Sequence, residues 1–204
     1  MSLESWNAHY ANGHTPWDSG VPDPHLRELV PTLPIRRALA IGCGTGTNAL
    51  WMAAQGLDVT AVDLAPLALE RACQKAATVA RPPRFHHADV LVDPLGGPYD
   101  FVYDRGCFHA FDDPPAQARF AAQVAAHLVQ GGHWLSIIGS TEGPSRRGPP
   151  SRSVRDIAQA VEPFLEILSL SAAWFPEHGA TAWRLLVRRR LQPAHASTLR
   201  ETLR

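Results

Sequence analysis

A short glycine-rich segment is the part of the sequence whose spacing points most directly to ligand chemistry. Gly42-Cys-Gly-Thr-Gly46 follows an apolar run, Arg37-Ala-Leu-Ala-Ile41, and precedes a run with helical spacing. Glycines permit a tight turn and let backbone N–H groups approach a ligand with no Cβ in the way. The dinucleotide-binding pattern requires its third glycine at position 47, where this chain has Thr47. The spacing predicts a ligand-binding turn, or a turn without a ligand, and argues against a nicotinamide dinucleotide.

Two acidic residues at the ends of expected strands could hold the sugar and the base of a nucleoside. Asp63 ends the second apolar run, about twenty residues after the first glycine, where a carboxylate can accept hydrogen bonds from both ribose hydroxyls. Its alternative role is to cap the helix that begins at Pro66. Asp89 could bind an adenine amino group, although aspartate is also common in turns. We expect Leu64 and Val90, which are next to these carboxylates, to contact the same ligand.

The segment Tyr103-Asp-Arg-Gly-Cys-Phe-His-Ala110 contains the candidate catalytic side chains. The positive charge of Arg105 can lower the pKa of a nearby thiol or orient an anionic substrate, and a salt bridge to Asp104 or Asp100 is the alternative. Asp104 is interpreted either as a base or as an anchor for the loop. His109, with an ordinary pKa of about 6.5, is a candidate general base or a packed, hydrogen-bonded side chain.

Alternating strand-like and helix-like segments must position these residues, which is the pattern of a parallel α/β sheet in a single domain. Ligands of such sheets bind beyond the carboxyl ends of the strands. Residues 1–21 and 140–152 lie outside the alternation and are expected to cover that edge as a cofactor lid and a substrate-side loop. We expect strands at 37–41, 58–62, 84–88, 99–103, 133–138, 165–170 and 183–187, and helices at 47–55, 66–79, 114–131 and 154–164.

The overall composition excludes several classes of partner. The 204 residues include 19 basic and 19 acidic side chains, so there is no positive excess to neutralise a nucleic acid. The apolar runs are too short to span a bilayer, and the first residues lack the features of an export signal, so a cytoplasmic protein is expected. The three cysteines and ten histidines show no metal-ligand spacing, and no metal site is predicted.

Three separated segments together resemble the thiopurine methyltransferase family and its thiol and halide methyltransferase relatives. They are Tyr10-Ala-Asn-Gly-His-Thr-Pro-Trp-Asp18, the glycine segment, and the Asp-Arg-Gly sequence within residues 103–110. Ala40 stands where many methyltransferases carry an acidic residue, and this replacement is itself a trait of the family. Gly148-Pro-Pro150 is similar to another family sequence, and the likeness extends over residues 5–190.

The resemblance implies a Rossmann-like, seven-stranded class I methyltransferase sheet, mostly parallel with one antiparallel strand near the C-terminus. It implies S-adenosyl-L-methionine as methyl donor, S-adenosyl-L-homocysteine as product, and a small soft nucleophile, foremost a thiol, as acceptor. It also implies that Trp17 packs beside the cofactor and that Arg105 faces the acceptor. Arg105, His109 and Asp104 are the expected catalytic residues. The expected cofactor contacts are Trp17, Gly42, Gly44, Gly46, Asp63, Leu64, Asp89, Val90 and Asp104.

The identity of the acceptor stays open at this stage, because the short segment between Trp174 and Trp183 offers no match to the family's substrate-facing residues. A monomer that methylates a small molecule in detoxification or secondary metabolism is expected. One alternative is N- or O-methylation of a small heteroaromatic, quinolone-like acceptor. Another is a module that binds S-adenosylmethionine without catalysis.

Overall fold

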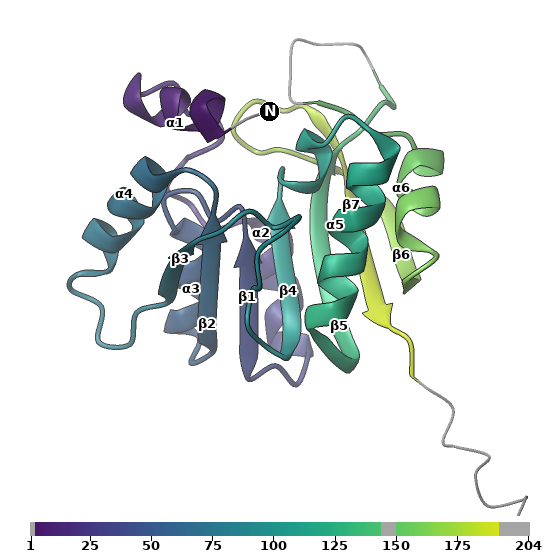
Figure 1. Cartoon of the computed structure of the whole chain (residues 1–204), viewed down its shortest axis with the longest axis horizontal. Coiled ribbons are helices and arrows are strands. Elements are labelled where there is room, and N and C mark those ends of the chain that lie inside the picture. The colour runs from purple at the N-terminus through teal and green to yellow at the C-terminus, as the bar shows by residue number, and fades with distance from the viewer. Residues whose placement is uncertain (1–2, 144–149, 192–204) are drawn as a thin grey trace, which may run out of the picture.

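A central sheet of seven strands has the order β3-β2-β1-β4-β5-β7-β6 (Figure 1). The computed structural model describes residues 3–143 and 150–191. β7 runs antiparallel to β5 and β6, and the other neighbouring strands are parallel, which confirms the expected arrangement. The strands are β1 (Arg37–Ile41), β2 (Asp58–Asp63), β3 (Arg84–His87), β4 (Tyr99–Arg105), β5 (Leu128–Gly139), β6 (Leu165–Trp174) and β7 (Thr181–Arg189).

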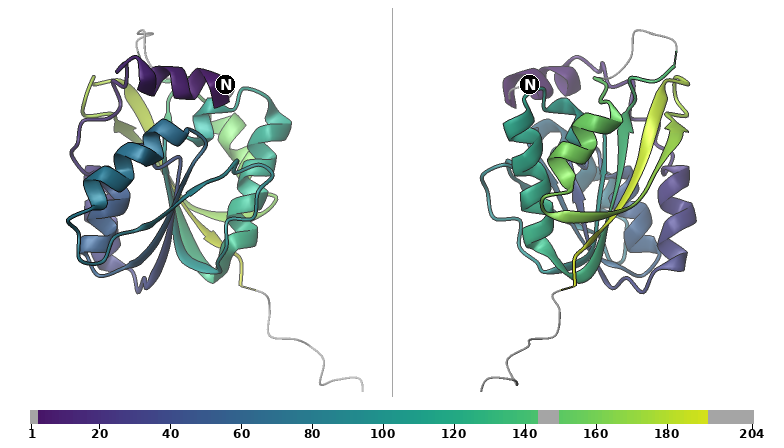
Figure 2. Two further views of the ribbon diagram at one scale, coloured as in Figure 1. Left: turned by 60° about the vertical axis from the view of Figure 1, so that its left-hand side comes forward. Right: turned by 90° about the vertical axis from the view of Figure 1, so that its right-hand side faces the viewer.

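Helices cover both faces of the sheet, and one helix lies across its edge. Figure 2 shows α3 and α4 on one side of the sheet and α5 and α6 on the other. In Figure 1, α1 lies at the end of the molecule toward which β2 points. The helices are α1 (Leu3–Ala11), α2 (Pro24–Leu29), α3 (Thr47–Ala54), α4 (Pro66–Ala76), α5 (Pro114–His127) and α6 (Val154–Val161), with short 3-10 turns η1 (Val30–Thr32) and η2 (Phe108–Ala110).

Local sequence explains where these helices begin. Asp113 caps α5 by accepting a hydrogen bond from Ala116 N, and Pro114 occupies the first helical position. Ser153 and Asp156 form a reciprocal capping box at the start of α6. Such side-chain caps satisfy backbone N–H groups that have no partner inside the helix.

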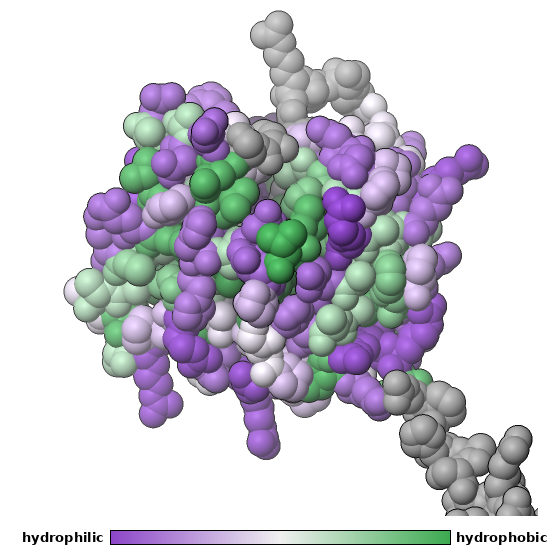
Figure 3. All heavy atoms as spheres, viewed as in Figure 1, coloured by the Kyte–Doolittle hydropathy of each residue, from purple (hydrophilic) through white to green (hydrophobic). Residues whose placement is uncertain are grey.

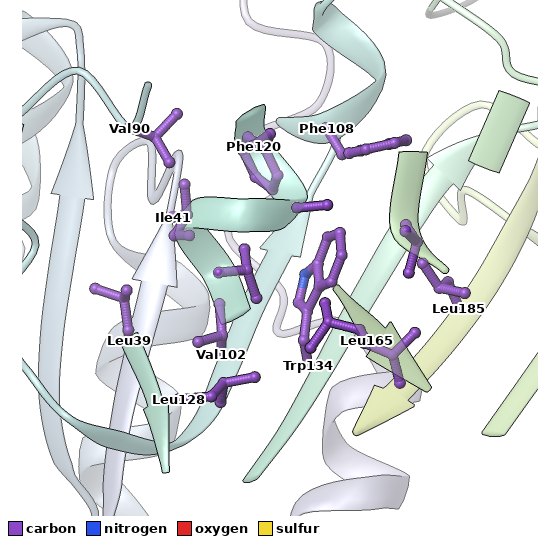
Figure 4. Packing of buried hydrophobic residues seen from close by; sticks show 14 of the residues in the cluster. Leu39, Ile41, Val90, Val102, Phe108, Phe120, Leu128, Trp134, Leu165 and Leu185 are labelled. Carbon is purple, nitrogen blue, oxygen red and sulfur yellow. The ribbon is translucent and has the colours of Figure 1, made fainter. Parts of the chain in front are cut away.

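The core has one apolar cluster on each side of the sheet, since the central strands are buried on both faces. In Figure 4, the fully buried Trp134 of β5 lies near Val102 of β4 and Phe120 of α5. Its ring is 5.9 Å from that of Phe108 and 5.7 Å from that of Phe120, measured between centroids. On the face shown in Figure 3, hydrophobic residues form separate areas among hydrophilic ones. No helix within the described ranges is long and apolar enough to cross a membrane.

The structure differs from the sequence expectation mainly at two N-terminal helices. Neither α1 nor α2 was expected. The helix that was expected to reach residue 131 ends at His127, and β5 starts at the next residue. Residues 144–149 of the expected substrate-side loop lie outside the described residues. The ends of that loop meet in an isolated bridge between Ser140 and Arg152.

Candidate functional site

The glycine segment forms a tight turn between β1 and α3. The φ angles of Gly42, Gly44 and Gly46 are 61°, 55° and 82°, a region that favours glycine. A Cβ at Gly44 would lie 3.1 Å from the hydroxyl oxygen of Tyr10, and one at Gly42 would lie 2.9 Å from Cβ of Cys107. Neighbouring groups therefore approach the turn so closely that side chains at these two positions would crowd them.

Asp63 at the end of β2 is bonded directly to this turn. Its Oδ2 accepts from Gly44 N at 2.7 Å, and its Oδ1 accepts from Ala65 N at 2.8 Å. Burial raises the pKa of the carboxyl group, and the hydrogen bonds from Ala65 and Gly44 oppose that rise. The N-cap residue of α4 is Ala65, so Asp63 stabilises the turn before the helix rather than capping it.

A cavity of about 840 Å³ lies beside the glycine turn at the carboxyl ends of β1, β2 and β4. Gly46 and Asp104 do not line it. Gly46 instead faces Ala72 and Phe85, and a Cβ there would lie 3.0–3.1 Å from them. The other predicted residues do line it, namely Trp17, Gly42, Gly44, Asp63, Leu64, Asp89, Val90, Arg105 and His109, and Pro150 of the 140–152 loop lines it too.

The N-terminal segment, residues 3–18, is fastened over the glycine turn by polar contacts. Asn7 Oδ1 accepts from Leu67 N in the first turn of α4, and Arg71 donates to Tyr10 O at 2.6 Å. Asp18 accepts from Thr45 Oγ1 at 2.7 Å. Lys75, the only lysine in the chain, contacts Asp18 and Thr45. These contacts join a segment that precedes the first strand to the glycine turn and to α4.

Four rings of this segment pack together on the cavity wall: Trp6, His9, Tyr10 and Trp17. The centroid of the Trp17 ring lies 5.7 Å from that of Trp6 and 5.4 Å from that of His9, and both contacts are edge to face. Tyr10 is 3% exposed, and its hydroxyl accepts from Trp17 Nε1 at 3.4 Å. The cavity thus has an aromatic wall that lies close to the glycine turn at Tyr10.

Arg105 is the centre of a buried ionic cluster. Its Nε lies 3.0 Å from Asp23 Oδ2, its Nη1 donates to Trp17 O at 3.2 Å, and its Nη2 pairs with Glu177. The guanidinium carbon also lies 5.0 Å from the centre of the Phe175 ring. One cation therefore faces two carboxylates, and its charge is already balanced by the protein. The expected alternative partners, Asp104 and Asp100, are not the ones that the structure shows.

Asp104 lies beneath the cavity and is fully buried. Its Oδ1 accepts from Phe108 N at 3.0 Å and from Cys107 N at 3.2 Å, and its Oδ2 accepts from Trp134 Nε1 at 2.8 Å. Burial raises the pKa of Asp104 to about 6, with the hydrogen bond from Phe108 as the main opposing effect. Of its two expected roles, this placement favours the anchor for the loop after β4 over the base.

The hydrogen bonding of His109 fixes which ring nitrogen carries the proton. Nδ1 accepts from the backbone N–H of Gly139 at 2.7 Å, and a backbone N–H can only donate. Nε2 must then carry the proton of the neutral ring. Burial, together with the charges of Arg152 and Arg105, lowers the pKa of His109 to about 3. The ring is therefore neutral with its proton on Nε2, which is the wrong state for a general base.

This pKa predicts a pH dependence of stability that replacement by asparagine should remove. The unfolded imidazole takes up a proton at about pH 6.5, whereas the folded one does so only near pH 3. Acidification within that window therefore favours unfolding, by up to about 1.4 kcal/mol per pH unit. His109→Asn keeps an oxygen that can accept from Gly139 N but cannot titrate. Urea unfolding of both proteins from pH 7 to pH 4 measures the difference, and parallel curves would contradict the assignment.

Three residues that line the cavity, Tyr103, Phe175 and Glu177, and one partner of Arg105, Asp23, were not predicted from the sequence. Tyr103 lines the cavity, and its alternation with Arg105 on β4, which puts both side chains on one face, could have indicated this. Asp23 precedes Pro24, which is a recognisable helix start. Phe175 and Glu177 lie in the turn between β6 and β7, where nothing in their spacing reveals a partner 72 residues away at Arg105.

The fold and this cavity define a class I S-adenosylmethionine-dependent methyltransferase. The residues present suit that cofactor, because Gly42 and Gly44 line the cavity with no side chains, and Asp63 and Asp89 line it as well. The chain belongs to the thiopurine S-methyltransferase family, whose match covers residues 1–171. It is an S-adenosylmethionine-dependent methyltransferase.

Named relatives and solved structures agree with this placement. The chain is 30% identical to the probable thiol methyltransferase 2 of Arabidopsis thaliana, over 79% of this chain and 73% of that protein. It is 38% identical to thiocyanate methyltransferase 1 of Brassica oleracea, over 65% of this chain and 60% of that protein.

Two solved structures share the fold at sequence identities below 25%. One comes from work on the conversion of a disulfide bond into a thioacetal group during echinomycin biosynthesis, with a TM-score of 0.79, 24% identity, and coverage of 94% of this chain and 93% of that chain. The other is the Burkholderia thailandensis 1,6-didemethyltoxoflavin-N1-methyltransferase with bound 1,6-didemethyltoxoflavin and S-adenosylhomocysteine. Its TM-score is 0.76 and its sequence identity is 20%, with coverage of 93% of this chain and 87% of that chain.

Proposed function

We propose that this enzyme methylates the sulfur atom of a small thiol. The supporting observation is the state of the distal wall, which we define as Tyr103, Arg105, His109, Phe175 and Glu177. Nδ1 of His109 is occupied and its pKa is low, and the Glu177 carboxylate is paired with Arg105. The distal wall therefore offers no free base, and an acceptor that arrives already ionised, such as a thiolate, suits it best.

The titratable groups near this wall support the same proposal. Asp23 is paired with Arg105, and Asp104 is bonded beneath the floor. His178 is exposed at the wall, and its Nδ1 accepts from Ala180 N at 3.3 Å. Burial raises the pKa of Cys107 well above its ordinary value, so this thiol stays protonated and is no nucleophile. The names of the thiol and thiocyanate methyltransferase relatives point to the same soft acceptors.

The main contribution of the protein is then to bind the methyl donor and the thiol and to align them for transfer. S-adenosylmethionine, when bound, supplies a methyl group activated by its positive sulfur. We propose that Asp63 binds the ribose of the cofactor and that Asp89 binds its adenine. Leu64 and Val90 would contact the same part of the cofactor, and the backbone of Gly42 and Gly44 would bind its methionine end. Trp17 would cover this cofactor, and precise alignment can contribute about 7–11 kcal/mol to such a displacement.

The experiment is a pH–rate profile with two thiols of different acidity. Mass spectrometry first establishes which acceptors gain a methyl group when S-adenosylmethionine is supplied. We then expect kcat/KM to rise with pH through the pKa of each thiol, so that the inflection shifts when the thiol is changed. An inflection that stays at one pH for both thiols would reveal a protein base. Methylation of ring nitrogens or hydroxyls but not of thiols would overturn the proposal.

We further propose that the N-terminal segment acts as a lid over the cofactor. Deleting residues 1–21 removes the aromatic wall and the contact of Trp17 with Arg105. We expect affinity for S-adenosylhomocysteine to fall by about tenfold, the scale of one or two lost contacts with an aromatic ring. Calorimetry measures the affinity, and circular dichroism checks that the sheet remains. Unchanged affinity in a folded protein would contradict the lid.

A further inference from the structure

The hydroxyl group of Tyr103 is a buried donor without a partner. The residue is 2% exposed, it lines the cavity, and its hydroxyl makes no hydrogen bond with any of the residues that the structure describes. A buried polar group left unpaired in this way costs stability. Burial also raises the pKa of Tyr103 well above its ordinary value, so the phenol keeps its proton. A phenol that keeps its proton and belongs to a residue lining the cavity is a candidate donor to a ligand bound there.

A second neutral donor lies on the same wall. The Nε2–H of His109 makes no hydrogen bond within residues 3–143 and 150–191, while the other ring nitrogen accepts from Gly139 N. Phe175 contacts this ring edge to face, with 5.9 Å between centroids, and Arg105 lies over the same phenylalanine. The distal wall therefore combines two uncharged donors with an aromatic surface.

The charges beside Arg105 disfavour an anionic substituent of the acceptor at that part of the wall, apart from the sulfur itself. Arg105 faces both Asp23 and Glu177, and the side-chain exposures of the three residues are 9%, 1% and 14%. Two carboxylates around one guanidinium leave a negative charge in excess. A carboxylate or phosphate on the acceptor would be repelled, whereas a neutral carbonyl oxygen has two lone pairs and no charge.

We propose that Tyr103 and His109 bind a neutral carbonyl oxygen of the methyl acceptor. This inference rests on the proposed thiol methylation, and it concerns the remainder of the acceptor molecule, because the sulfur has to face the methyl group of the cofactor. The two donors would select carbonyl-bearing thiols and fix their orientation while the sulfur faces the methyl group. Tyr103 and His109 are then specificity-determining residues of the acceptor site.

The test compares benzenethiols that carry an acetyl, an ethyl or a carboxylate group, each as its ortho, meta and para isomers. Acetyl and ethyl are similar in size, but only acetyl has a carbonyl. We expect at least one acetyl isomer to have a higher kcat/KM than the matching ethyl isomer, and the carboxylates to be poorest. Tyr103→Phe and His109→Asn should each reduce the acetyl-to-ethyl ratio by about three- to tenfold, the scale of one neutral hydrogen bond. Comparing ratios between proteins cancels the effect of the substituent on thiol acidity.

Tyr99→Phe is the matched control, since this buried tyrosine of the same strand donates to Leu95 O at 2.7 Å. It should lower the melting temperature and leave the ratio unchanged, whereas Tyr103→Phe should leave the melting temperature unchanged or raise it. If benzenethiols are methylated but the ratio is the same in wild type and Tyr103→Phe, this inference alone fails. If S-adenosylhomocysteine binds and no thiol is methylated, the proposed function fails and this inference with it.

Discussion

Replacing Arg105 with methionine is expected to lower the free energy of unfolding by about 3–5 kcal/mol, the cost of leaving buried carboxylates without their cation. Asp23 and Glu177 would lose their shared partner, and Trp17 O would lose a donor. Urea unfolding at neutral pH measures the change. Adding Glu177→Gln to Arg105→Met should recover part of the loss, because one unpaired charge is removed.

Arg188→Met provides the control for this prediction. Arg188 also pairs with a glutamate, Glu166, but the two side chains are 36% and 44% exposed. Exposed pairs contribute at most about 1 kcal/mol, so the control should be nearly neutral. Equal effects of the two substitutions would mean that the cluster at Arg105 contributes no more than a surface ion pair.

Asp63→Ala is expected to weaken binding of S-adenosylhomocysteine by about ten- to a hundredfold, which corresponds to 1–3 kcal/mol for a buried hydrogen-bonding group. The variant loses the proposed ribose contact and also the acceptor for Gly44 N, so the glycine turn is less well ordered. Calorimetric titration of the purified protein measures the affinity.

Asp58→Ala is the matched control on the same strand. Asp58 lies at the opposite end of β2, is about half exposed, and pairs with Arg84 and Arg37 at the surface. Its replacement should leave the affinity unchanged. The assignment of Asp63 would be wrong if both variants bound the product as tightly as wild type.

The centre of the sheet could be predicted from sequence because β1 and β2 are apolar runs that end beside a glycine and at an aspartate, respectively. Ala38 to Ile41 and Val59 to Asp63 are buried throughout, as parallel strands between two layers of helices require. Helix α1 could not be predicted this way, because Tyr10 is its only buried residue. Its position depends on contacts with Leu67 and Arg71, which lie about sixty residues further along the chain.

The candidate site could be predicted only in part, because residues that are far apart in the sequence complete it. Asp63 and the glycines lie next to the elements that position them, and their spacing could be read directly. Arg105 was expected to face the acceptor, with a salt bridge to a neighbour in sequence as the alternative. Its carboxylate partners are instead brought to it by the N-cap of α2 and by the turn between β6 and β7. The tautomer of His109 depends on Gly139, 30 residues away, and no local pattern reports that hydrogen bond.

The attachment of the N-terminal segment has a kinetic consequence. Asn7, Tyr10, Trp17 and Asp18 hold it to α4, to the glycine turn and to Arg105, on several sides of the cavity. If this segment is the proposed lid, spent cofactor beneath it would leave only after these contacts open. Steady-state turnover should then be paced by product departure, and a rapid first turnover should precede a slower steady phase.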